Sequence, residues 1–168
     1  MDAYSLLVIG HLIGTVLGVG GATMIEVQLN RALADGNMSA DERGMLGLDF
    51  TVLRIGLILS VFTGVGFIII YKMTGQEFRL ANPVFWAKMA MILIITINAL
   101  LLQAHKVSLY WGSALSFITW WGAMILGLFL TNGIRHGFIE IMVFYVILIV
   151  AGAYVLHKIR EHIKNKHV

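Results

Sequence analysis

The chain has 168 residues, of which 59% are hydrophobic and only 12% charged, and its mean hydropathy is +0.87. This composition excludes a soluble globular protein and indicates an integral membrane protein. The net charge of +3 owes much to the last residues, "HKIREHIKNKHV", so it reports on membrane topology and gives no reason to expect nucleic-acid binding. The absence of cysteine excludes disulfides, thiolate metal sites and a thiol nucleophile.

Five apolar runs are each long enough to cross a hydrocarbon core of about 30 Å as a helix. They cover about 3–25, 50–72, 83–104, 109–131 and 138–157. We therefore predict an all-α fold, a single domain formed by a bundle of five transmembrane helices. The lipid bilayer is the expected partner, and a homo-oligomer or a larger membrane complex is compatible with so apolar a chain.

The longest polar connection lies between the first two runs. Asp35, Gly36 and Asn37 indicate a turn there, and Ser39 followed by Glu42 matches a capping box. We therefore predict a short interfacial helix that begins near Ser39, between spans one and two.

The first span contains a histidine, His11, within an otherwise apolar run. A histidine at this depth loses hydration and needs a partner. It is either a neutral imidazole bonded to a hydroxyl or a backbone carbonyl, or a cofactor ligand or proton-transfer group. On the same face, Thr15 follows one turn later and Glu26 near the end of the run.

Beside this face runs a ridge of small residues spaced four apart. The ridge consists of Gly10, Gly14, Gly18 and Ala22. Such a ridge lets another backbone or a flat ligand approach the helix closely.

The third span has one face with three polar residues among apolar ones. This face consists of Lys88, Met91, Ile95, Asn98, Leu102 and His105. Since a helix rises about 1.5 Å per residue, Lys88 and His105 lie roughly 25 Å apart, and His11 lies within about one turn of Lys88 in depth. We predict that His11 and Lys88 share a site in the outer leaflet, unless Lys88 merely reaches the interface, and that His11 and His105 cannot bind one iron.

Other polar or aromatic residues allow two interpretations each. Arg54 in the second span is either an anchor at the inner interface or a partner of Asp49 or Glu26. In the fourth span, Trp120 and Trp121 either pack in the core or line a cofactor pocket.

Two histidines close spans three and five at similar depth. His105 and His157 could together bind a second iron, or simply be helix-terminal residues compatible with the helix dipole. The first alternative is a hypothesis that requires both side chains at one site.

The basic residues of the C-terminal tail predict the orientation. They are Lys158, Arg160, Lys164 and Lys166. By the positive-inside rule the C-terminus is cytoplasmic, and five spans then place the N-terminus outside. The expected location is a bacterial-type inner (plasma) membrane.

His11 and the segment "NPVFWAKMAMILIITINALLLQAHK" carry a family resemblance. The chain resembles the HemJ-type membrane protoporphyrinogen oxidases and the wider set that includes CopD-like copper-resistance membrane domains. The HemJ type has a histidine in the first span, a tryptophan and a lysine at the start of the third, and bound haem b. The resemblance implies that His11 is the axial ligand of haem b and that Lys88 meets a propionate. The remaining residues implied to line this site are Trp86, Thr15, Gly14 and Gly18.

The resemblance therefore implies a haem-b-binding membrane redox protein, with an oxidoreductase activity on a tetrapyrrole as the corresponding enzyme function. The residues alone leave open whether the chain is an enzyme. One alternative is a non-enzymatic accessory or structural subunit whose polar face locks helices together. Another is a small metal-handling or transport protein, in which the face from Lys88 to His105 lines a route through the bilayer, with Glu26 near its inner mouth.

Overall fold

The computed structural model describes residues 2–34, 38–134 and 136–166, and these ranges contain helices and no strand. The elements are α1 (Ala3–Ala34), α2 (Ala40–Met73), the short 3-10 helix η1 (Glu77–Arg79), α3 (Pro83–Gln103), α4 (Leu109–Thr131) and α5 (Phe138–Lys166). All five α-helices are long and apolar enough to cross a membrane, so the predicted all-α membrane bundle is confirmed.

The connection between the first two spans differs from the prediction. The capping box is present: the Ser39 hydroxyl accepts the Glu42 N–H at 3.2 Å, and the Glu42 carboxylate accepts the Ser39 N–H at 2.7 Å. The helix that begins there is not a separate interfacial helix, however, because it continues into span two as the 34-residue α2. Once the box has started the helix, no proline interrupts its hydrogen bonds. The predicted turn at 35–37 lies outside the described residues.

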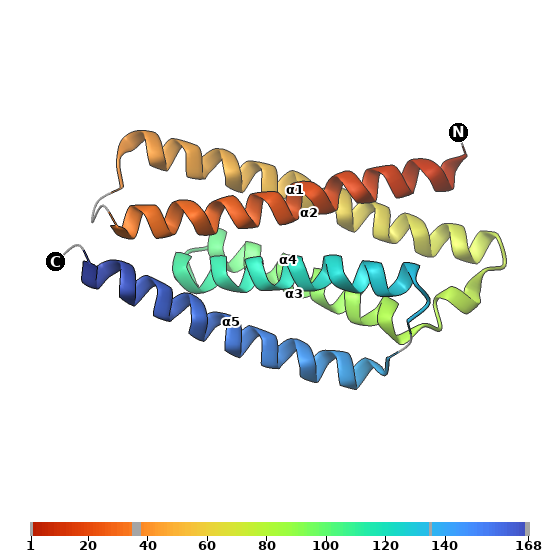
Figure 1. Cartoon of the computed structure of the whole chain (residues 1–168). Coiled ribbons are helices and arrows are strands. Elements are labelled where there is room, and N and C mark those ends of the chain that lie inside the picture. Colours follow the sequence, from red (N-terminus) through yellow and green to blue (C-terminus); the bar gives the residue numbers. More distant parts are fainter. Residues whose placement is uncertain (1, 35–37, 135, 167–168) are drawn as a thin grey trace.

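The helices run antiparallel, and the two termini lie at opposite ends of the bundle (Figure 1). We call these the N-terminal and C-terminal ends of the bundle. Helix α1 has a central place, because it packs along α2 and also contacts α4 and α5. Helix α3 pairs mainly with α4 and touches α2 only slightly. The bundle therefore consists of an α1–α2 pair joined through α1 to a layer of α3, α4 and α5.

The small-residue ridge of α1 forms the contact with α2 and α4. A Cβ atom placed on Gly56 of α2 would lie 2.6 Å from the backbone nitrogen of Gly18, and one on Gly14 would lie 3.0 Å from the carbonyl oxygen of Gly56. On the other side of Gly18, the indole ring of Trp120 would lie 2.3 Å from such a Cβ atom. Trp120 is 1% exposed, so it is a core-packing residue.

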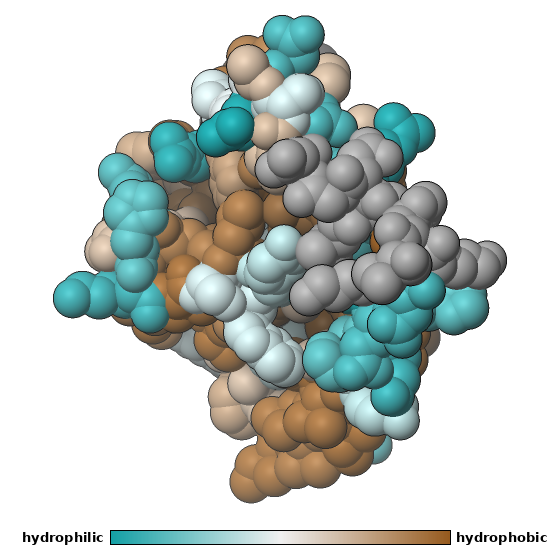
Figure 2. Space-filling model, turned by 90° about the vertical axis from the view of Figure 1, so that its left-hand side faces the viewer, coloured by the Kyte–Doolittle hydropathy of each residue, from teal (hydrophilic) through white to brown (hydrophobic). Residues whose placement is uncertain are grey.

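Lipid-facing surfaces explain why so many large apolar side chains remain exposed on these helices. Hydrophilic residues gather instead around the C-terminal end of the bundle, which Figure 2 shows end-on with apolar residues visible between them. The distribution is that of a membrane-embedded bundle with polar ends.

Candidate functional site

His11 contacts polar side chains from two other helices. Its Nδ1 atom lies 2.8 Å from Oγ1 of Thr63 on α2, and its Nε2 atom lies 2.9 Å from Nζ of Lys88 on α3. The predicted proximity of His11 and Lys88 is therefore confirmed, and Thr63 is an addition that sequence reasoning missed. We call these three residues the His–Lys–Thr triad.

The hydrogen bonds of the triad determine which nitrogen of His11 carries the proton. The Thr63 hydroxyl donates to the Leu59 carbonyl at 2.6 Å, so toward His11 it can only accept, and Nδ1 is the donor. The Lys88 side chain is a donor, so Nε2 accepts from it. His11 is thus a neutral imidazole with its Nε2 lone pair directed at Lys88.

The triad is partly buried, with His11 and Lys88 half-buried and Thr63 buried. The Phe67 ring meets the His11 ring edge-on, with centroids 5.5 Å apart. The Lys88 nitrogen lies 3.2 Å from the place that a Cβ atom would take on Gly127 of α4, so this glycine makes room for it. Among the described residues, Lys88 forms no ion pair with a carboxylate. The positive charge of the triad therefore has no counter-charge within the described part of the chain.

The other predicted cofactor contacts do not converge on the imidazole. The Trp86 indole donates to the Leu80 carbonyl at 2.6 Å. Trp86 is 49% exposed, because residues two apart on a helix do not share a face and Lys88 lies on the inward face. The Thr15 hydroxyl donates to the His11 backbone carbonyl at 2.9 Å. The space beside Gly14 and Gly18, which the resemblance implies to line the haem site, is filled by α2 and by Trp120.

The polar face of α3 is divided among separate sites. Asn98 is buried and donates to the Gly112 carbonyl at 2.8 Å and to the Ser116 hydroxyl at 2.9 Å, both on α4. Met91 and Ile95, which are also buried, separate it from Lys88. Each polar group thus has its own partners, which gives no support to a continuous polar route along this face.

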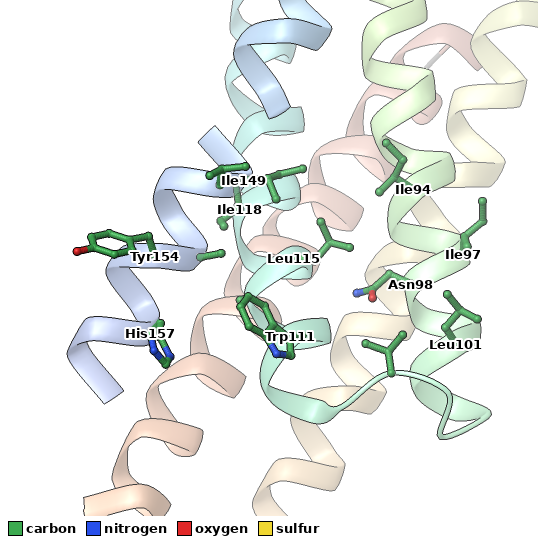
Figure 3. A pocket seen from close by; sticks show the side chains of 14 residues that line it. Ile94, Ile97, Asn98, Leu101, Trp111, Leu115, Ile118, Ile149, Tyr154 and His157 are labelled. Carbon is green, nitrogen blue, oxygen red and sulfur yellow. The ribbon is translucent and has the colours of Figure 1, made fainter. Parts of the chain in front are cut away.

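His105 and His157 line two different cavities. His105 lines a cavity of about 420 Å³ between α2, α3 and α4. His157 lines a more apolar cavity of about 650 Å³ between α3, α4 and α5 (Figure 3), and its Nε2 atom lies 3.3 Å from Oε1 of Glu161. Within the described ranges no group of three or more metal-ligating side chains occurs. The structure does not bring these two histidines together, and the second iron stays a prediction without geometric support.

A second buried polar site, near the C-terminal end, was not predicted as such. Arg160 of α5 binds the Glu26 carboxylate of α1, with side chains 13% and 5% exposed. The guanidinium also donates to the Tyr110 carbonyl at 3.0 Å and, at 3.4 Å, to the Ser113 hydroxyl. We call these four residues the Glu26–Arg160 cluster.

The sequence places Arg160 in the basic tail, because the apolar run ends near residue 157, but the helix continues beyond that residue. A stripe on α5 contains the signal that identifies it: the residues on this stripe, spaced three or four apart, are Ile141, Tyr145, Ile149, Gly152, Leu156 and Arg160. Continuing that stripe by one turn places Arg160 on the inward face.

The predicted partners of Arg54 are engaged elsewhere. Asp49 accepts a hydrogen bond from Gln28 at 2.7 Å, and Glu26 binds Arg160. The alternative in which Arg54 pairs with either carboxylate is therefore wrong.

No protein-family model, no curated protein and no solved structure matches this chain. The resemblance to the HemJ-type oxidases and CopD-like domains therefore stays a prediction.

Proposed function

We propose that the chain is an integral membrane protein that binds haem b, with His11 as the axial ligand. The observation that carries this proposal is the hydrogen-bonding state of His11. A metal-binding histidine ordinarily donates its second ring N–H to a fixed acceptor, which orients the other nitrogen toward the metal. Thr63 is such an acceptor, and the Nε2 lone pair is the one that an iron would take.

The donor chemistry of the triad fits haem, but the site is closed. Lys88 occupies the Nε2 lone pair, and His11 lines neither of the two cavities described above. Binding therefore requires Lys88 to leave the imidazole, which its flexible four-carbon stem permits. Lys88 would then be free to hold an anionic propionate, which would supply the counter-charge that the described residues do not provide.

Bound haem would supply one-electron chemistry, and a tetrapyrrole oxidation is the enzyme function that accompanies this proposal. The chain's own residues orient the imidazole through Thr63, hold the anionic edge of the ligand through Lys88 and keep water out with Phe67.

A non-enzymatic structural subunit is the second candidate, and a specific observation favours it. Helices α2 and α3 touch only slightly, yet Thr63, His11 and Lys88 link α2, α1 and α3 in one chain of hydrogen bonds. In this case the triad holds the two halves of the bundle together and binds no ligand.

Absorption spectroscopy separates the two candidates. Full-length protein purified after haem supplementation should show a Soret band and a b-type pyridine haemochrome, because a chain without cysteine cannot attach haem through thioethers. His11→Ala should lose the band while it still inserts and purifies, whereas His136→Ala, at an exposed His–Glu pair, should keep it.

The outcomes differ for each candidate. Wild-type protein without a Soret band would rule out haem binding and favour the structural-subunit candidate. Normal haem content in His11→Ala would remove His11 as the ligand.

We further propose that the C-terminal end of the bundle is cytoplasmic, in a bacterial-type inner membrane. Basic residues support this orientation, because more of them lie at that end than at the other. Among the residues that the structure describes, those at the C-terminal end include Arg31, Arg43, Lys106, Lys158 and Arg160, against Lys72 and Arg79 at the N-terminal end.

Since the chain lacks cysteine, single Asp2→Cys and Asn165→Cys variants can be labelled from each side of the membrane. Labelling of both from one side would contradict the five-span topology.

A further inference from the structure

Arg54 is a cation within the membrane-spanning helix α2. It lies in α2, its side chain is exposed at the surface of the bundle, and among the described residues it forms no ion pair. An arginine exposed to hydrocarbon is costly, so such a residue either reaches the interface or binds an anion.

Arg54 opens onto the cavity of about 420 Å³ between α2, α3 and α4. This cavity exists because α2 and α3 diverge and touch only slightly. Gln103 and His105 from the end of α3 supply two further polar side chains, while Leu57 and Ala99 are among the residues that form an apolar wall. The cavity thus combines a cationic, hydrogen-bonding mouth with an apolar interior.

The depth of Arg54 matches the level of lipid headgroups. Its neighbour Leu53 packs against Gly21 of α1, with the Leu53 backbone nitrogen 3.1 Å from the place of a Gly21 Cβ atom. Gly21 lies ten residues beyond His11 and eighteen beyond Ala3, so Arg54 is about 15 Å deeper than the triad and about 27 Å from the start of α1. In a hydrocarbon core of about 30 Å, this places Arg54 near the boundary at the C-terminal end.

We propose that this cavity binds one anionic phospholipid, with its phosphate at Arg54 and His105 and an acyl chain along Leu57 and Ala99. A guanidinium binds a phosphate through two parallel hydrogen bonds, and basic pockets between spans on the cytoplasmic side recognise acidic headgroups. In a net negative headgroup the phosphate charge is free to balance Arg54, which forms no ion pair among the described residues, whereas in a zwitterionic headgroup the lipid's own ammonium already balances it. This site is separate from the His–Lys–Thr triad and does not depend on haem.

A lipid titration tests the proposal. Full-length protein in detergent micelles is titrated with dioleoylphosphatidylglycerol or dioleoylphosphatidylcholine, and the melting temperature is followed by tryptophan fluorescence. The anionic lipid should raise the melting temperature and the zwitterionic lipid should not. Arg54→Gln should weaken the apparent affinity for phosphatidylglycerol about tenfold, because one charge-assisted contact is lost. Arg43→Gln, at an exposed arginine earlier in α2, is the matched control and should leave it unchanged.

Further variants keep the test decisive. If Arg54→Gln does not purify, Ala99→Phe fills the apolar wall and leaves the charge in place, and it should also weaken the response to phosphatidylglycerol. His11→Ala should keep the response, which separates this proposal from haem binding.

Four results would overturn the proposal. They are equal shifts with both lipids, an unchanged affinity in Arg54→Gln and Ala99→Phe, an equal shift with inorganic phosphate alone, and loss of haem from Arg54→Gln, which would make a propionate the anion at Arg54.

Discussion

Two polar sites between the helices join this bundle, and their charges differ. The His–Lys–Thr triad links α1, α2 and α3 through a lysine and a neutral imidazole. The Glu26–Arg160 cluster links α1, α4 and α5 through a carboxylate and a guanidinium. His11 and Glu26 lie fifteen residues apart on α1, or about 22 Å along its axis.

This difference distinguishes a structural site from a candidate ligand site. In the cluster, the charges of Glu26 and Arg160 compensate each other, although Oε2 of Glu26 and Nε of Arg160 are buried without a hydrogen-bond partner among the described residues. In the triad, the charge of Lys88 lacks a carboxylate partner among the described residues, so an anionic ligand would complete the site. The following substitutions test whether the two sites respond as this comparison requires.

The largest effect is expected from Glu26→Gln in the cluster. Removing one partner leaves Arg160 as an uncompensated buried charge, which should lower the free energy of unfolding by about 3 kcal/mol. Chemical denaturation of the detergent-solubilised protein measures this loss. The double variant Glu26→Gln/Arg160→Gln should recover part of it. Glu140→Gln, at a pair that is 65% exposed on the glutamate side, should change little. A loss near zero for Glu26→Gln would contradict a structural role.

Gly18→Ala is expected to rank second, because Gly18 lies on α1 between the two sites. The new methyl group would clash with the Trp120 ring, which lies 2.3 Å from its position, and should cost about 2 kcal/mol of stability. Gly20→Ala is a matched control with no atom within 4 Å of the new methyl group, and it should be neutral or slightly stabilising. Thermal unfolding of both variants is the measurement. Equal melting temperatures would show that the indole moves aside at no cost.

Thr63→Val tests the orientation of His11 at nearly constant volume. Loss of the acceptor for Nδ1–H should cost about 1 kcal/mol of stability and, if His11 is an iron ligand, about 10- to 100-fold in haem affinity. Thr96→Val is the control, since the Thr96 hydroxyl bonds only the Ile92 carbonyl of its own helix. Haem titration followed at the Soret band separates the two effects. A purely structural triad would show the loss of stability in a protein that binds no haem.

The smallest change in stability is expected from Lys88→Met. Removing a charge that has no counter-ion should change the free energy of unfolding by about 1 kcal/mol or less, or raise it. Haem retention should nevertheless fall, but less than in His11→Ala, because water replaces a propionate contact more easily than an iron ligand. Parallel unfolding and haem-content measurements test both parts. A loss of stability as large as that of Glu26→Gln would show that Lys88 has a structural role and holds the helices together.

Local patterns predicted much of the fold and one contact of the site. The five apolar runs, the capping box at Ser39 and the start of α3 at Pro83 depend on neighbouring residues only, and all appear in the structure. The pairing of His11 with Lys88 also followed, because the rise per residue determines depth within a spanning helix. The end of α5 was missed, because hydropathy stops at the membrane boundary while helical hydrogen bonding does not.

Local sequence patterns could not predict the contacts between helices that are distant in the sequence. Thr63 is one of several threonines in the chain, and nothing local indicates that it faces His11. The small-residue ridge predicted a close approach, but only the packed bundle shows that Gly56 and Trp120 take that space.

The sequence by itself determined that this is a bundle of five apolar helices and that His11 and Lys88 lie at one depth, because hydropathy and helical rise are properties of each segment alone. Only the tertiary structure decided which polar groups meet around the helix axes. Rotation of each helix depends on how all its neighbours pack, so the pairing of Glu26 with Arg160, and the lack of a partner for Arg54 among the described residues, emerge only when the five helices are assembled.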